Sequence, residues 1–183
     1  MLYHWAKTSK LVVAVAITVL PFSFSTQARA STCAAEPLVS GIAAAFAHAA
    51  RNHSAHGFAS AAGQYADMHS VALFALGPYR SQLSPDDEAH YVVLARSFLG
   101  RWMAENSDRV SGEGFVIQSC TEQVVTAHLH SGTSLVFRLS GPKRVSDISV
   151  SGISLTSVLR DKFTNVLRAH GGDIQALLDY LDQ

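Results

Sequence analysis

The sequence VSDISVSGISL, residues 145–155, decides how the second half of this chain folds. Its apolar side chains Ile148 and Val150 alternate with polar ones, which is the pattern of a strand with one buried face. Gly152 interrupts the pattern, and Ser154 is a residue type that caps helices. The stretch therefore predicts a strand, a turn and the start of a helix.

Two helices are expected after this stretch. The first carries an apolar stripe at helical spacing, made of Leu155, Val158, Leu159, Phe163, Val166 and Leu167. Gly171 and Gly172 are suited to end this helix, and Asp173 is suited to cap a short final one. The chain is therefore expected to finish on two consecutive helices.

The rest of the chain separates into a helical part and a strand part. Apolar residues recur at helical spacing over 36–52, 58–76 and 84–105, and the last of these ranges begins with the strong start signal Ser84-Pro85. From Gly114 the period changes to two, which predicts four strands at 115–120, 124–130, 134–139 and 144–150. We therefore expect an α+β fold, with helices packed on a four-stranded, mainly antiparallel twisted sheet. The pattern permits either a large core or an enclosed apolar pocket between the helices and the sheet.

The N-terminus has the pattern of a cleavable signal peptide. Two lysines precede the apolar run 11–20, and residues 28–30, Ala-Arg-Ala, offer the small side chains of a cleavage site. We expect residues 1–30 to be the signal peptide and residues 31–183 to be one domain exported to the periplasm. That domain holds 11 basic and 14 acidic residues, a formal charge of −3, so no nucleic-acid partner is expected.

The C-terminal pattern resembles the MlaC or toluene-tolerance family of periplasmic phospholipid-binding proteins. The resemblance is carried by Asp147, Gly152-Ile153-Ser154-Leu155, Arg160, Phe163, Gly171-Gly172 and, earlier, by Ala75-Leu76-Gly77, Tyr79 and Arg80. It implies a lipid carrier without enzymatic activity or cofactor. By the same resemblance, the carrier would shuttle phospholipid between an outer-membrane lipoprotein complex and an inner-membrane ABC transporter with an MCE-domain subunit, helping to maintain outer-membrane lipid asymmetry.

Two alternatives stay open at this point. Lys143-Arg144 and Ser151 depart from the usual family pattern, and hopanoid-associated relatives look similar, so the cargo could be a hopanoid or another polycyclic lipid. An enzyme of a cone-shaped α+β fold is the more distant alternative, with Asp147 or His128 as its base. Strand alternation, however, places Asp147 away from the buried face, which favours a structural role such as pairing with Arg160 or another basic group.

Other candidate sites concern histidine and cysteine. His128 and His130 share one face of a strand, but no third ligand of matching geometry is visible there, nor beside the loop residues His53 and His56, so no metal site is expected. The two cysteines of the exported domain, 33 and 120, could form a disulfide or remain free thiols.

The apolar faces of helices and strands supply the candidate wall of a lipid pocket. The candidates are Leu73, Leu76, Tyr91, Leu94, Phe98, Trp102, Phe115, Phe137, Ile148, Val150, Leu159 and Phe163. Core and pocket residues look alike in one sequence, because both are apolar and both follow the period of their element.

Overall fold

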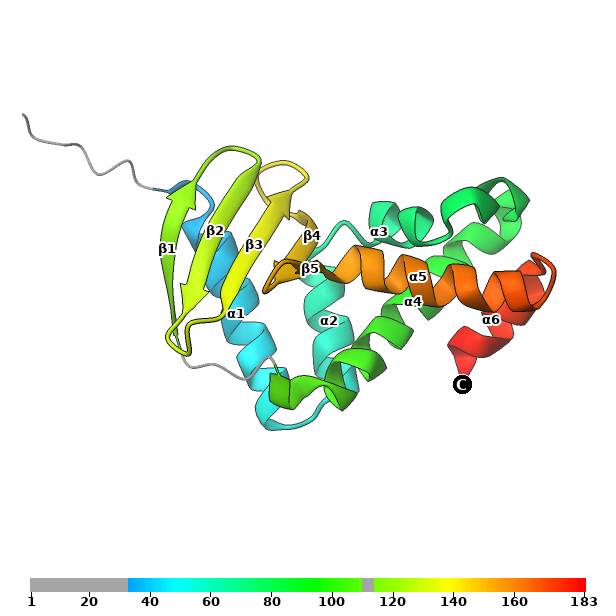
Figure 1. Cartoon of the computed structure of the whole chain (residues 1–183), viewed down its shortest axis with the longest axis horizontal. Helices are drawn as coiled ribbons and strands as arrows, with labels where there is room; N and C mark the ends of the chain where they lie inside the picture. Colours follow the sequence, from blue (N-terminus) through cyan, green and yellow to red (C-terminus); the bar gives the residue numbers. More distant parts are fainter. Residues whose placement is uncertain (1–32, 110–113) are drawn as a thin grey trace, which may run out of the picture. The chain divides into compact units, whose positions relative to one another are not determined.

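A computed structural model of the chain describes residues 33–109 and 114–183, and its elements form an α+β fold, as expected (Figure 1). Before the sheet come α1 (Glu36–Arg51), α2 (Ala55–Tyr65), α3 (Met68–Ala75), the 3-10 helix η1 (Gly77–Gln82), α4 (Pro85–Glu105) and the 3-10 helix η2 (Ser107–Arg109). The strands are β1 (Phe115–Cys120), β2 (Val124–Leu129), β3 (Ser134–Leu139), β4 (Val145–Val150) and β5 (Ile153–Ser154), followed by α5 (Leu155–Ala169) and α6 (Ile174–Asp182). All described elements belong to one compact unit, Thr32–Gln183, whereas the expected signal peptide lies outside the described residues.

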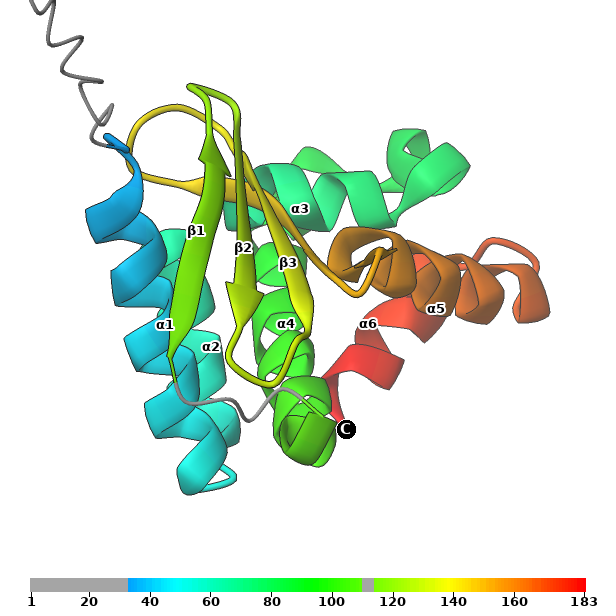
Figure 2. The ribbon, with the colours of Figure 1, turned by 60° about the vertical axis from the view of Figure 1, so that its left-hand side comes forward.

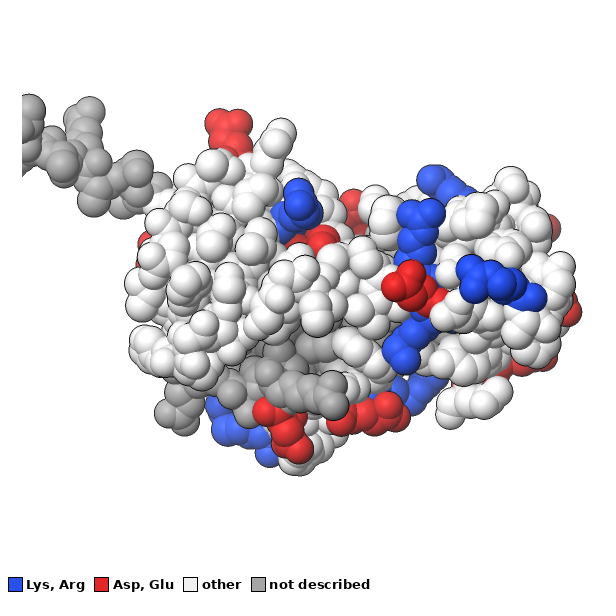
Figure 3. Space-filling view, viewed as in Figure 1, with Lys and Arg blue, Asp and Glu red and all other residues white. Residues whose placement is uncertain are grey.

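The strands pair in chain order, and every pairing is antiparallel. The sequence predicted four strands, and the fifth, β5, is a two-residue strand that pairs with the end of β4 across the turn at Gly152. Val125, Phe137 and Ile148 are cross-strand neighbours on the buried side of the sheet. Helix α1 lies behind this side (Figure 2). Few charged side chains lie over the opposite, solvent-facing side (Figure 3).

The helix predicted over residues 58–76 is two helices, α2 and α3, with a break at Ala66 and Asp67. Ala66 forms a parallel bridge with Val145 of β4, and the Asp67 backbone N–H donates a hydrogen bond to the Val145 carbonyl oxygen at 2.8 Å. The Asp67 carboxylate then accepts a hydrogen bond from the Ser70 N–H at 3.2 Å and caps α3. The helix prediction was wrong here because tertiary pairing with β4 overrides local helix propensity.

The helix starts predicted at Ser84, Ser154 and Asp173 are confirmed. Ser84, Ser154 and Asp173 each accept a hydrogen bond from a backbone N–H two or three residues later, which satisfies a donor that the helix itself leaves free. Gly171 and Gly172 follow α5 with φ of 64° and 90°, a backbone region that favours glycine. No helix in the described part of the chain is long and apolar enough to cross a membrane.

Helices α3, α4, α5 and α6 share a buried apolar core, termed here the helical core, part of which borders the inner compartment described below. Tyr91 of α4 and Phe163 of α5 are fully buried in it, and their rings meet edge to face with centroids 6.4 Å apart. The Phe98 ring also meets the Phe163 ring edge to face, with centroids 5.4 Å apart. The Tyr91 hydroxyl donates a hydrogen bond to the Ala72 carbonyl oxygen at 2.7 Å, and burial raises the pKa of this phenol.

A disulfide joins Cys33, just before α1, to Cys120 at the end of β1, with the two Cα atoms 5.6 Å apart. The sequence left this pairing open, and the structure forms it. The bond joins residues 87 positions apart in the sequence and links the N-terminal end of α1 to the sheet. The α1 helix is thereby tied covalently to the sheet that it faces.

Candidate functional site

An apolar hollow of about 460 Å³, termed here the outer compartment, lies between α1 and the buried side of the sheet. Helix α1 lines it with the small side chains of Ala43, Ala44 and Ala47, whereas the sheet lines it with larger ones that include Phe115 and Phe137. Because an alanine side chain ends at Cβ, this face of α1 does not fill the space in front of the sheet. The hollow follows from that mismatch in side-chain size.

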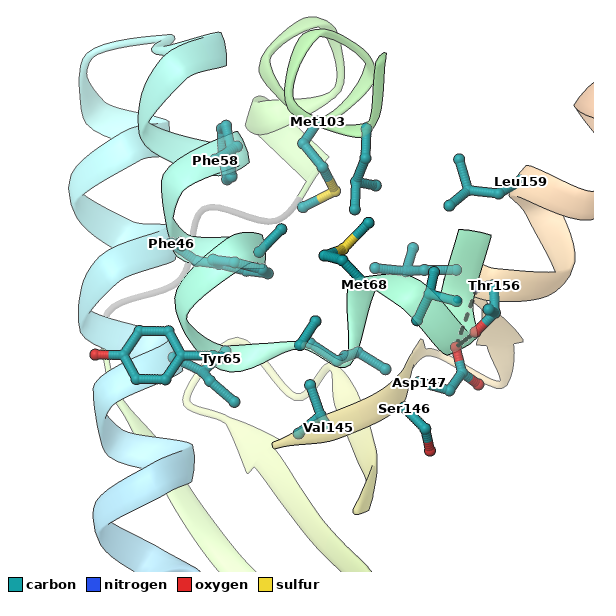
Figure 4. Close-up of a pocket in the computed structure, with 18 residues that line it drawn as sticks. Phe46, Phe58, Tyr65, Met68, Met103, Val145, Ser146, Asp147, Thr156 and Leu159 are labelled. Atoms are coloured by element: carbon teal, nitrogen blue, oxygen red, sulfur yellow. Dashed lines mark hydrogen bonds between the residues drawn. The ribbon is translucent and has the colours of Figure 1, made fainter. Parts of the chain in front are cut away.

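A smaller hollow of about 50 Å³, termed here the inner compartment, adjoins the first among α2, α4, β4 and the start of α5 (Figure 4). Six apolar residues line both compartments: Ile42, Phe46, Phe58, Met103, Ile148 and Leu155. The rings of Phe46 and Phe58 meet edge to face with centroids 5.6 Å apart. These six residues form a partition, and the flexible Met103 side chain gives it a means of rearranging.

The Asp147 carboxylate at the edge of the inner compartment is already paired. It accepts hydrogen bonds from the Thr156 backbone N–H, at 3.1 Å, and from the Thr156 hydroxyl, and so holds the first turn of α5 to β4 (Figure 4). Asp147 thus has the structural role that was expected, but its partner is Thr156 and not Arg160, whose guanidinium lies 4.9 Å from the ring centre of Phe74. Asp147 pairs in register with Arg138, and it borders the inner compartment where the first turn of α5 lies against β4.

The histidines do not converge on a site. His128 and His130 are exposed on and just after β2, and Nδ1 of His53 lies 2.9 Å from the Ser107 hydroxyl. Within residues 33–109 and 114–183, no group of three or more His, Cys, Asp or Glu side chains is placed to hold a metal ion. Most of the side chains that line the two compartments are apolar, which suits the binding of apolar groups.

A family model described as MlaC protein matches residues 42–183, from the middle of α1 to the last residue. The chain belongs to the MlaC family. The match spans the sheet and all the elements that line the two compartments, and it confirms the resemblance carried by the C-terminal pattern.

A solved structure shares the fold of this MlaC-family chain. It is a phospholipid-binding protein from Ralstonia solanacearum in complex with a phospholipid. The two chains are 20% identical, the TM-score is 0.63, and the match covers 81% of this chain and 93% of the other. At this identity the likeness establishes the fold. A search of curated proteins finds no match.

The structure divides the twelve candidate pocket residues of this MlaC-family protein into two groups. Those that line a compartment are Phe115, Phe137, Ile148, Val150 and Leu159. Those that line neither are Leu73, Leu76, Tyr91, Leu94, Phe98 and Phe163, which belong to or pack against the helical core, and Trp102, which packs near Phe58 and Met103. A lipid contact for any of the twelve stays a prediction.

Sequence reasoning missed the α1 side of the hollow in this MlaC-family fold. It gave weight to large aromatic residues, whereas α1 contributes Ala43 and Ala47, one helical turn apart, with Phe46 beside them. A signal was present: a helix with alanines at i and i+4 on its apolar face cannot fill the space in front of a sheet rich in larger side chains. Phe58 and Met103 carried no such signal, because only the packing of α2 and α4 brings them together.

Proposed function

We propose that this MlaC-family protein is a periplasmic lipid carrier that holds the tails of a phospholipid in the outer and inner compartments. The observation that carries the proposal is the apolar hollow of about 460 Å³ between α1 and the sheet, with the inner compartment beside it. Membership of the MlaC family and the phospholipid in a structure of the same fold support this choice of ligand.

The transfer of a lipid tail through water explains why such a hollow is needed. An acyl chain of about sixteen methylenes, at ~0.8 kcal/mol each, loses on the order of 13 kcal/mol when it enters water. Unaided crossing of an aqueous gap is therefore very slow. A carrier that replaces the bilayer around the tails, and leaves the polar head near the surface, removes most of this barrier by binding and release alone, with no covalent chemistry and no cofactor.

We further propose that the carrier exchanges lipid with an outer-membrane lipoprotein complex and an inner-membrane ABC transporter bearing an MCE-domain subunit. In this scheme the transporter hydrolyses ATP, and the carrier only binds and releases. The proposal rests on family membership and on the expected signal peptide, residues 1–30, which would deliver the domain to the periplasm.

Lipid extraction of the exported protein from its native host, followed by mass spectrometry, tests the cargo. We expect about one diacyl glycerophospholipid per protein. Recovery of a hopanoid or another polycyclic lipid instead would assign the alternative cargo, and protein that never carries a lipid would overturn the carrier function.

A matched pair of variants on α1 tests where the tails lie. Ala47→Trp places a large ring in the outer compartment, and we expect it to reduce the lipid recovered per protein at least tenfold. His48→Trp is the control, because His48 is exposed on the same helix and lines neither compartment. Equal lipid content in the two variants would place the tails elsewhere.

A further inference from the structure

A cleft of about 260 Å³ between α2, α3 and α4 is not used by the tail site described above. Two arginines line it, Arg96 from α4 and Arg144 from the segment just before β4. The volume is several times the roughly 30 Å³ that one water molecule occupies in the liquid, so the cleft has room for a polyatomic ion.

The two guanidinium groups meet at Gly63 of α2. Nη1 of Arg144 donates hydrogen bonds to the Gly63 carbonyl oxygen at 3.2 Å and to the Ala66 carbonyl oxygen at 2.8 Å. Nη1 of Arg96 lies 3.1 Å from the point where a Gly63 Cβ would stand. The missing side chain therefore admits the Arg96 guanidinium, and Arg144 is held in place by backbone oxygens.

Arg96 is unpartnered in this position. Its Nε is buried and has no hydrogen-bond partner within the described residues, and no carboxylate there forms an ion pair with either arginine. Nε itself is out of reach of solvent, so a ligand in the cleft would pair with the Nη groups of the same guanidinium, which shares the positive charge and has no carboxylate partner within the described residues.

The acidic groups nearby have other partners. The Asp67 carboxylate lines the cleft but caps α3 through the Ser70 N–H, and the His69 ring pairs with the Glu88 carboxylate at 2.6 Å. Arg96, Arg144 and Asp67 give the lining a formal charge of +1, not counting the His69–Glu88 pair. The cleft therefore favours an anion.

The cleft also adjoins the tail site. Ala66 and Met68 line both the cleft and the inner compartment, and Met68 lies among the pocket side chains (Figure 4). A group bound by the two arginines would lie across the Ala66 and Met68 side chains from the inner compartment.

We propose that Arg96 and Arg144 form a binding site for a phosphate group. Two guanidinium groups match the oxygens of a phosphate better than other cationic side chains do, because each offers planar, paired donors. The phosphate could belong to a lipid headgroup or be inorganic phosphate. The headgroup form rests on the proposed lipid-binding function, whereas the free-anion form does not.

The first experiment titrates the mature protein with inorganic phosphate in a calorimeter. We expect saturable binding at one site, weakened at least tenfold in Arg96→Met, because a charge-assisted hydrogen bond is lost. Arg168→Met is the matched control, since Arg168 is exposed and donates a hydrogen bond to the Asn165 side chain, three residues earlier on the same helix. The melting temperature of Arg96→Met should equal or exceed that of the parent protein, because the variant removes an unpaired buried donor. Arg144→Met should melt at a lower temperature than the parent, because it loses the hydrogen bonds to the Gly63 and Ala66 carbonyl oxygens.

A second experiment separates the two sources of phosphate. The protein is loaded from mixed micelles of phosphatidylglycerol and diacylglycerol with identical tails, and mass spectrometry counts each bound lipid. For a headgroup site, we expect the protein to prefer phosphatidylglycerol and Arg96→Met to lower that preference at least tenfold. Phosphate binding that Arg96→Met weakens, together with an unchanged lipid preference, would assign the site to the free anion.

Gly63→Ala tests whether the site is built or is only a positive surface. The added Cβ keeps both charges but crowds Arg96 Nη1, so it should weaken phosphate binding although the net charge is unchanged. Absence of saturable phosphate binding, with a lipid preference that Arg96→Met leaves unchanged, would overturn the proposal. Failure of both lipids to load would count against the carrier function instead, and the phosphate titration would still report on the cleft.

Discussion

The helical core and the α1–sheet region are made of the same kinds of side chain but pack differently. In the helical core, Tyr91 and Phe163 are in ring contact and leave no exposed surface. In the α1–sheet region, Phe115 and Phe137 face the alanines of α1 across the outer compartment. The first region is held by packing, whereas the second combines a hollow with the Cys33–Cys120 disulfide.

This difference shows how one small domain can be stable and still hold a cavity large enough for a ligand. Side chains that pack closely against one another stabilise the fold. The cavity forms in the α1–sheet region, where small side chains on one element face large ones on the other. A covalent link can offset the missing packing on the hollow side, because it limits how far the unfolded chain can spread.

Loss of the disulfide should have the largest effect, because it removes the covalent tie of the hollow region. For a sequence separation of 87, we expect Cys33→Ser/Cys120→Ser to lower the free energy of unfolding by about 4 to 5 kcal/mol. Urea unfolding with and without reductant measures the effect, and the double variant should be insensitive to reductant. A loss below about 1 kcal/mol would mean that packing alone holds α1 to the sheet.

Truncation of one phenylalanine in each region should give unequal losses. Phe163→Ala opens a cavity in the filled helical core and should cost about 4 kcal/mol, whereas Phe137→Ala, which borders existing empty space, should cost about 2 kcal/mol. Chemical denaturation of both variants measures the difference. Equal losses would show that the hollow is filled in solution or that the core around Phe163 relaxes.

Removal of a single hydroxyl should have the smallest effect. Tyr91→Phe loses the hydrogen bond to the Ala72 carbonyl oxygen and should cost about 1 kcal/mol, whereas Tyr65→Phe, at the inner compartment, should change stability by less than about 0.5 kcal/mol. Burial raises the pKa of Tyr91 in the folded state above its value in the unfolded chain. The neutral phenol therefore stabilises the folded protein fully below pH ~10, and this stabilisation is lost as the pH rises above that value. Above pH ~10 the parent protein should therefore lose stability more steeply than Tyr91→Phe, and parallel pH profiles would contradict this.

Much of the fold could be predicted because it depends on local signals. The caps at Ser84, Ser154 and Asp173 and the period-two segments gave the helix starts and four of the five strands. The break at Ala66 could not be predicted in this way, because its cause is a bridge to Val145, which lies far along the chain. Strand β5 was missed because two residues are too few to show a period.

The sequence by itself determined which faces of the elements are apolar, where the helices capped by Ser84, Ser154 and Asp173 start, and the pattern by which the family is recognised. Only the tertiary structure decided which apolar faces meet. The stripe of α4 with Tyr91 and Phe98 packs against α5, whereas the sheet faces the alanines of α1. The physical reason is that periodicity marks a side chain as buried, but a filled core and an empty pocket differ only in the size of the side chains that a distant element brings opposite.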